Sequence, residues 1–175
     1  MGNTGNARTT PPHLHFGIYT GSGAIDPLPF VNPEVREPKA ITAATANLNA
    51  TLRSSNKTEL RESPDAKSLS IKKLEPSTIV LVEAATDSWY KAKLPDGSIG
   101  YVASKSLSPV KSGLRSLKLN PQQLALYEQP TAAAPVKKTL DSGATVNLIG
   151  RFEDFLLVRD AEAETGWVTA ALTVK

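Results

Sequence analysis

Leu60-Arg61-Glu62-Ser63-Pro64 returns 66 residues later as Leu126-Tyr127-Glu128-Gln129-Pro130, and this repetition decides the fold. The same offset aligns Gly100-Tyr101-Val102 with Gly166-Trp167-Val168 near the end of each copy. Because one offset holds over about 40 positions, the chain contains a duplicated unit rather than two turns that happen to be similar.

Each copy contains short strand-like stretches separated by turn sequences. Residues 78–82, which are mainly apolar, and residues 145–149, which alternate polar and apolar side chains up to Leu148, are typical of short strands. The turns are rich in glycine, proline and aspartate, for example Pro95-Asp96-Gly97 and Asp141-Ser142-Gly143. About five short strands in about 60 residues predict a small barrel. The predicted fold class is therefore all-β, with two tandem small barrels.

The order of motifs in each copy resembles bacterial SH3-like (SH3b) domains. Those domains begin with a leucine strand and a Ser-Pro turn, carry a bulky aromatic in mid-domain, and close with Gly-aromatic-Val followed by a leucine. The first copy supplies Leu60 to Pro64, Trp89-Tyr90, and Gly100-Tyr101-Val102 with Leu107. The resemblance covers about residues 48–110 and 115–175, and it implies two SH3-like domains joined at residues 109–113.

A second SH3 family is a weaker match. Ala125-Leu126-Tyr127-Glu128 is similar to the opening motif of eukaryotic signalling SH3 domains. The paired tryptophan in mid-domain and the Pro-x-Asn-Tyr motif before the last strand of that family are missing. The bacterial resemblance is therefore preferred.

The aromatic residues of the repeats are the candidate ligand-binding residues. Trp89 and Trp167 lie in apolar strand patterns, which favours a place in the core of so small a barrel. A sugar or peptide groove needs exposed rings beside hydrogen-bonding groups, and Tyr90, Tyr101 and Tyr127 could supply them. All five residues are retained as predicted binding residues.

The front of the chain holds its two histidines, His13 and His15, one residue apart. Side chains two positions apart on an extended strand project from the same face, about 7 Å apart. This spacing lets one imidazole bind a metal ion while the other faces a substrate. The alternative is a pair of exposed strand residues with no such role.

The residues around the histidines resemble the closing segment of the M23 (LytM-like) metallopeptidases. The matching stretches are Gly2-Asn3-Thr4-Gly5, Pro12-His13-Leu14-His15-Phe16-Gly17 and Ala24-Ile25-Asp26-Pro27. That family consists of zinc endopeptidases that cut peptides of the bacterial cell wall on an antiparallel β scaffold. The resemblance implies zinc as cofactor, His15 as a zinc ligand and His13 as a catalytic residue that polarises the attacking water or the oxyanion.

The same resemblance argues against catalysis by this chain alone. The remaining family ligands, a histidine and an aspartate in an HxxxD segment, belong upstream of His13, and only 12 residues precede it. Asp26 belongs to a segment that closes the domain in that family and is not predicted to bind metal. The start, Met1-Gly2-Asn3-Thr4-Gly5, lacks the basic and apolar regions of a secretory signal. We therefore expect Met1 to be an internal start or the edge of a fragment.

The domain organisation follows from these motifs. Residues 1–32 are predicted to be the C-terminal fragment of an M23-type peptidase domain. Residues 33–47, rich in Pro, Ala, Thr, Glu and Lys, are predicted to be a linker that buries little. Residues 48–110 and 115–175 are the two predicted SH3-like domains.

Composition excludes several classes of function. The net charge is +3, and acidic and basic residues are interleaved, so nucleic acid is not an expected partner. The chain has no cysteine, which excludes disulfides and thiolate sites. No apolar stretch approaches the roughly 20 residues that span a bilayer. Composition does not predict the oligomeric state.

Two functions remain from the sequence. In the first, the chain is the C-terminal part of a cell-wall zinc endopeptidase whose tandem SH3-like modules bind peptidoglycan or its peptides. In the second, it is a stand-alone, non-catalytic binding or tethering protein with a vestigial peptidase segment. Both resemblances imply a location in the bacterial cell envelope.

Overall fold

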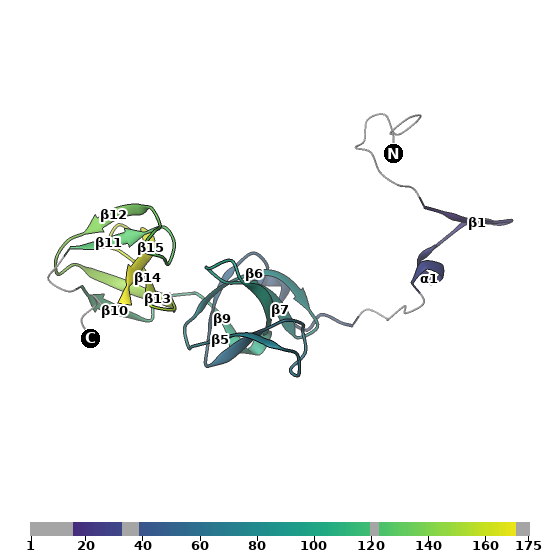
Figure 1. The fold of residues 1–175 in the computed structure, drawn as a ribbon, viewed down its shortest axis with the longest axis horizontal. Helices are drawn as coiled ribbons and strands as arrows, with labels where there is room; N and C mark the ends of the chain where they lie inside the picture. The colour runs from purple at the N-terminus through teal and green to yellow at the C-terminus, as the bar shows by residue number, and fades with distance from the viewer. Residues whose placement is uncertain (1–15, 33–38, 120–122, 171–175) are drawn as a thin grey trace, which may run out of the picture. The chain divides into compact units, whose positions relative to one another are not determined.

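Antiparallel β-sheet forms most of the regular structure in the computed structural model, which describes residues 16–32, 39–119 and 123–170. The chain divides into two units, Met1–Pro38 and Lys39–Lys175 (Figure 1). The prediction of an all-β fold is confirmed. None of the helices in the described ranges is long and apolar enough to cross a membrane.

The described part of the first unit is a hairpin followed by one helical turn. Strands β1 (Ile18–Thr20) and β2 (Gly23–Ile25) pair in register, and α1 covers Leu28–Val31. Gly23 closes the turn with a φ of 119°, a conformation that other residues adopt at a cost. No residue of this hairpin and helix is buried. The segment therefore has no core of its own.

The second unit begins with a seven-stranded sheet, called module 1 here. Its strands are β3 (Thr51–Ser54), β4 (Thr58–Arg61), β5 (Ser70–Leu74), β6 (Ile79–Thr86), β7 (Trp89–Lys93), β8 (Ile99–Ala103) and β9 (Leu107–Pro109). The strand order is β5-β4-β8-β7-β6-β3-β9. Alternate residues of these strands, among them Leu52, Leu60, Val80, Val82 and Val102, are fully buried and form the core.

A six-stranded sheet follows and is called module 2. Its strands are β10 (Arg115–Lys118), β11 (Leu124–Tyr127), β12 (Val136–Leu140), β13 (Thr145–Phe152), β14 (Phe155–Arg159) and β15 (Thr165–Thr169). Read from β12, the order β12-β11-β15-β14-β13-β10 repeats that of the first six strands of module 1.

The repeat extends to the irregularities of the two sheets. The register between β4 and β5 shifts at Leu60/Arg61, and that between β11 and β12 shifts at Leu126/Tyr127, which is the same place in the repeat. The ladders β6–β7 and β13–β14 also shift at equivalent positions. The sequence duplication is therefore a duplication of backbone geometry.

The segment predicted to be a linker is in part folded onto module 1. Residues 33–38 lie outside the described residues, but Ala43 is only 4% exposed. The backbone N–H groups of Thr42 and Ala43 both donate to the carbonyl of Asp87, at 2.9 and 2.8 Å. Ala43 is thus held against the β6–β7 turn, while the other residues of 39–47 are exposed or half-buried. The extent of the linker stays a prediction.

The two modules contact each other through the β13–β14 hairpin. The backbone N–H of Arg151 donates to the carbonyl of Ser77 at 2.8 Å, and Ile79 packs with Phe152 in one buried cluster. A Cβ atom on Gly150 would lie 2.4 Å from Cδ1 of Ile79, so only glycine allows this approach. Phe152 itself is 2% exposed. The hairpin tip of module 2 is thus part of the core that it shares with module 1.

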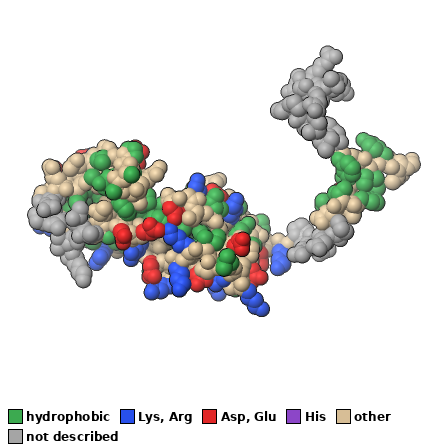
Figure 2. All heavy atoms as spheres, in the orientation of Figure 1, with side chains coloured by type: hydrophobic (Ala, Val, Ile, Leu, Met, Phe, Trp, Pro, Cys, Tyr) green, Lys and Arg blue, Asp and Glu red, His purple; other side chains and the backbone are tan. Residues whose placement is uncertain are grey.

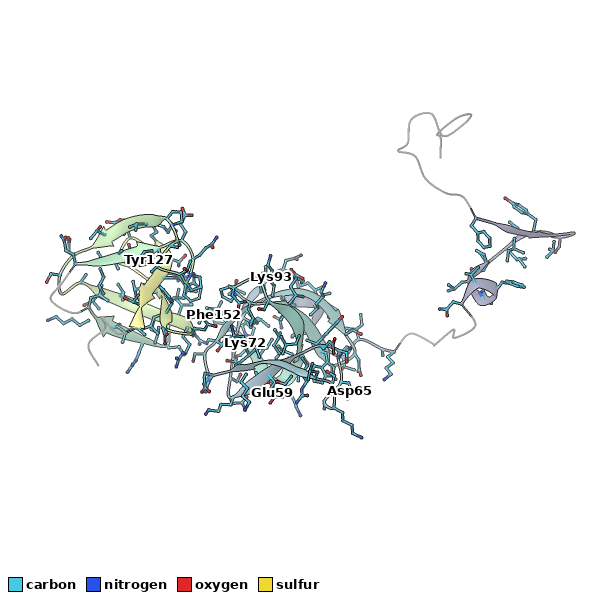
Figure 3. The ribbon with its side chains drawn as sticks, viewed as in Figure 1. Glu59, Asp65, Lys72, Lys93, Tyr127 and Phe152 are labelled. Carbon is cyan, nitrogen blue, oxygen red and sulfur yellow. The ribbon has the colours of Figure 1, made fainter. Side chains whose placement is uncertain are left out.

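Lys72 adds ion pairs to the contact between the modules (Figure 3). Its Nζ lies 2.7 Å from Asp96 of its own module, 2.5 Å from Glu153 of module 2, and 4.7 Å from the ring centroid of Phe152. Burial lowers the pKa of Lys72, but the hydrogen bonds to Asp96 and Glu153 outweigh it and raise the pKa above its ordinary value. Lys72 therefore stays charged where the modules meet.

Candidate functional site

The predicted peptidase residues are not placed by the structure, because His13 and His15 lie outside the described residues. Their described neighbour Asp26 has a local role: its Oδ1 accepts a hydrogen bond from the N–H of Leu28 at 2.9 Å, ahead of the helical turn.

A grouping of three carboxylates lies in module 2. Carboxylate oxygens of Asp160, Glu162 and Glu164 lie within 4.8 Å of one another. The ammonium of Lys138 makes ion pairs with all three, at 2.8 Å to Glu162 and 3.6 Å to Glu164. The hydrogen bond from Lys138 lowers the pKa of Asp160 despite its burial. A lysine thus serves as the counterion of this cluster, so the cluster does not indicate a metal site.

Tyr90 was a candidate for an exposed ligand-binding ring, but the structure buries it. Its side chain is 2% exposed, its hydroxyl donates to the carbonyl of Ala44 at 2.9 Å, and it accepts from the amide of Asn47 at 3.0 Å. The strand phase is the physical reason, since Tyr90, Ala92 and Leu94 all face the core. Tyr90 therefore offers no ring face to a ligand.

Three other predicted aromatics lie on β8, β11 and β15. Trp167 is 7% exposed and belongs to the buried cluster between the modules, as its strand pattern favoured. Tyr127 is half-buried and meets Phe155 edge to face, with ring centroids 6.3 Å apart. Tyr101 is half-buried and pairs with Arg61 across β8 and β4. The structure thus gives Trp167 and Tyr127 packing roles, and their part in binding stays a prediction.

Trp89, which was expected in the core, is half-buried and lines a groove of about 530 Å³ in module 1. The groove forms where two strands diverge: β4 pairs with β8 only at Arg61 and Tyr101, and beyond that pair β4 has no strand on this side among the described residues. Thr58 and Glu59 of β4 form one wall, and Ala103 of β8 lies opposite. The groove therefore combines an aromatic ring with an open strand edge.

Charged side chains of both signs line the groove. Figure 2 shows acidic and basic side chains intermixed on the visible face of the second unit. Nη2 of Arg61 lies 2.5 Å from the carboxylate of Glu59, and Nη1 donates to the carbonyl of Ser68 at 2.5 Å. Lys57 and Glu75 form a looser pair at 3.5 Å on the rim. The side chain of Lys73 makes no hydrogen bond or ion pair with any other described residue. The lining contains three basic residues and two acidic ones.

Module 2 does not repeat this set of charges. The residues of module 2 at the positions of Lys57, Glu59, Arg61, Lys73 and Trp89 are Gln123, Ala125, Tyr127, Thr139 and Phe155. Four charged side chains are thus replaced by uncharged ones on the same backbone, and Tyr127 packs on Phe155. Among the described residues, the charged lining of the groove is therefore found in module 1 and is not repeated in module 2.

Module 1 is also the part of the chain that a known family covers. Residues 54–109 match the bacterial SH3 domain. This match includes the groove strands β4, β5, β7 and β8, and it confirms the SH3-like fold expected from the repeat motifs. No curated protein matches the chain.

Solved structures of low similarity include NlpC2 from Trichomonas vaginalis, with 10% identity and a TM-score of 0.40 over 72% of this chain and 48% of that one. NlpC1 from the same organism has 10% identity and a TM-score of 0.40, over 79% and 52%. An NlpC/P60 endopeptidase from Photobacterium damselae subsp. piscicida has 16% identity and a TM-score of 0.32, over 78% and 33%. The chain thus spans about half of the first two structures and a third of the last.

The charged groove residues Glu59, Arg61 and Lys73 were missed from the sequence. Two signals could have indicated them. One is strand phase, because Trp89 shares its face of β7 with Lys91 and Lys93 while Tyr90 alternates to the core. The other is the difference between the copies, since charged residues of the first copy align with uncharged residues of the second.

Proposed function

We propose that residues 39–175 bind peptides of peptidoglycan and that module 1 holds them in its groove. The observation that carries this is the groove itself, in which a half-buried Trp89 lies beside three basic side chains and an open edge of β4. The match of the same residues to the bacterial SH3 domain supports it. On this proposal the protein works in the bacterial cell envelope.

The groove fits an extended peptide better than a compact ligand. A strand edge without a partner presents N–H and C=O groups that can pair with a peptide backbone, as in strand addition. Apolar side chains of the peptide can pack on the ring of Trp89, and polar or charged groups of the peptide can bind the charged side chains of the groove. The peptide chain would thus run along β4, between that strand and Trp89.

The test compares two ring positions that are equivalent in the repeat. We expect Trp89→Ala in the full chain to lower recovery on purified, insoluble peptidoglycan roughly tenfold, because it removes the aromatic anchor of the groove. Phe155→Ala is the matched control, since Phe155 is also half-buried. Thermal unfolding of both variants measures any loss of folding. Equal losses of binding in the two variants, or equal recovery without the polymer, would contradict the proposal.

We further propose that residues 1–32 are the end of an M23-type zinc peptidase domain. Beside the sequence resemblance, the support is that the large apolar side chains Phe16, Tyr19, Leu28, Phe30 and Val31 are all exposed, between 49% and 77%. Such a set of side chains normally packs in a larger core. In that domain His15 would be a zinc ligand and His13 a catalytic residue.

The zinc ion does not fit this chain alone. A catalytic zinc takes three protein ligands, and this segment offers two histidines, of which the resemblance assigns one to the metal. The same resemblance assigns no metal role to Asp26, whose Oδ1 accepts the N–H of Leu28. No step of hydrolysis is therefore assigned to this chain.

The second candidate function is a stand-alone tether with a vestigial peptidase segment. It is favoured by the buried cores that modules 1 and 2 form within Lys39–Lys175. Both candidates share the groove and its ligand. They differ in the coding sequence before Met1, where an in-frame histidine and aspartate at HxxxD spacing would favour the peptidase.

A further inference from the structure

The positive charges of the groove are not all satisfied within the protein. Arg61 has Glu59 as its partner, and Lys57 has Glu75. The side chain of Lys73 is exposed and forms no hydrogen bond or ion pair with another described residue. The groove therefore carries one positive charge that its own carboxylates do not balance.

Arg61 is held in a fixed position beside this free lysine. Its guanidinium is anchored on Glu59 and on the carbonyl of Ser68, both at 2.5 Å, and the side chain is 22% exposed. A guanidinium has five N–H donors in a planar fork, so two anchors leave donors for a ligand. A donor that is already ordered loses little entropy when it binds an anion.

Lys73 lies on the same wall as Arg61. It is the cross-strand partner of Glu59 in the β4–β5 ladder, and Glu59 binds Arg61. Side chains of directly opposed residues share one face of the sheet, so Lys73, Glu59 and Arg61 line the groove together. The adjacent Lys72 alternates away and reaches Glu153 of module 2.

We propose that the groove selects peptides with a free carboxylate, which Lys73 and Arg61 bind while the chain crosses Trp89. The proposal rests on peptide binding in the groove and adds which chemical group of the peptide decides affinity. A carboxylate satisfies the unbalanced charge and forms charge-assisted hydrogen bonds, whereas a neutral sugar or an amidated peptide leaves that charge unmatched. Module 2 has Thr139 and Tyr127 at these positions and takes no part in this selection.

The test changes the carboxylates of the ligand and the lysine of the groove independently. The probe is peptidoglycan freed of phosphate-bearing polymers, either untreated or with its carboxyl groups coupled to methylamine by a carbodiimide. We expect the full chain to bind the amidated polymer roughly tenfold more weakly than the untreated one. Lys73→Gln weakens binding to the untreated polymer about fivefold and makes the protein nearly indifferent to amidation.

Lys118→Gln in module 2 is the control, because Lys118 is exposed and lies on β10 and not in the groove. It removes the same charge and is expected to leave the amidation effect unchanged. Equal effects of Lys73→Gln and Lys118→Gln would mean that net charge and not the groove is responsible, which overturns the inference.

The remaining outcomes separate this inference from the proposed function. Strong binding that amidation does not weaken overturns carboxylate selection and leaves peptide binding standing. Binding that is lost when the phosphate-bearing polymers are removed assigns the anion to phosphate and also overturns it. Absence of binding to every form of the polymer contradicts the proposed function itself.

Discussion

Modules 1 and 2 place a lysine at the same position of the same strand, Lys72 on β5 and Lys138 on β12. Lys72 takes one carboxylate from its own module, Asp96, and one from the other, Glu153. Lys138 finds all its carboxylates within module 2, in Asp160, Glu162 and Glu164. Module 1 has Leu94 and Ser98 at the positions of Asp160 and Glu164 and therefore lacks these two carboxylates. Lys72 pairs with Glu153 of module 2 as well as with Asp96.

The tips of the equivalent hairpins β6–β7 and β13–β14 differ in burial. Phe152 at the end of β13 is buried between the modules, whereas its equivalent Thr86 at the end of β6 is exposed. The same backbone therefore has two roles. Module 1 has the charged groove and the surface on which the hairpin packs, whereas module 2 lacks the groove charges and has the hairpin tip that packs there. The difference lies in a few side chains and not in the fold.

The largest expected effect is at Phe152. We expect Phe152→Ala to lower the free energy of unfolding by about 3 kcal/mol, because it removes a buried ring and leaves a cavity between the modules. The equivalent substitution Thr86→Ala is the control and is expected to change stability by less than about 0.5 kcal/mol. Urea unfolding measures both. Equal effects of the two substitutions would contradict the assignment of docking to the tip of module 2.

A smaller effect is expected at Gly150, where the modules approach most closely. In Gly150→Ala the new Cβ would lie 2.4 Å from Cδ1 of Ile79 and 2.9 Å from the carbonyl oxygen of Ser77. Separating these atoms costs about 1–3 kcal/mol. Ala84 occupies the equivalent position in module 1 and is exposed, so Ala84→Gly serves as the matched change.

Coupling between Gly150 and Ile79 makes that prediction specific. Ile79→Ala removes the side chain that the new Cβ would meet, so the double variant Gly150→Ala/Ile79→Ala is expected to lose less stability than the two single changes added together. Simple additivity in thermal unfolding would indicate that Gly150 acts through its own backbone and not through the contact.

The fold could be predicted because the repeat carries it. Leucine, glycine and valine positions recur at one offset and specify the same strand order and the same register shifts twice. The docking of the modules could not be predicted in this way. It depends on Phe152 and Gly150, at positions where the copies differ. The sequence difference alone does not show which surface the β13–β14 hairpin contacts.

The candidate site was only partly predictable, for a related reason. Trp89 and Tyr90 are adjacent large aromatics, and strand phase alone decides which one faces the core. Lys73 and Arg61 come from different strands, and only the ladder between β4 and β5 brings them to one wall. Sequence motifs identify the family, whereas these cross-strand neighbours form the groove.

The smallest expected effect concerns pH and the two lysine clusters. The hydrogen bond from Lys138 holds the pKa of Asp160 below its ordinary value near 4. A depressed pKa means that the carboxylate stabilises the fold above that ordinary value and that this contribution is lost as the pH falls through the lower, folded-state value. We expect the contribution to be about 1 kcal/mol or less, because the ion pair is partly exposed.

Asp160→Asn should therefore flatten the fall of unfolding free energy between about pH 4 and pH 2, measured by urea unfolding at each pH. Asp96→Asn is the counterpart in module 1. Burial raises the pKa of Asp96, but its hydrogen bonds, above all that from Lys72, lower it overall, so the sign is the same. Asp96 receives one backbone N–H group, that of Ser98, besides Lys72, whereas Asp160 is 8% exposed and receives two besides Lys138. The flattening should thus be larger for Asp160→Asn, and the reverse order would show that the shared lysine of the docking face is the more sensitive of the two.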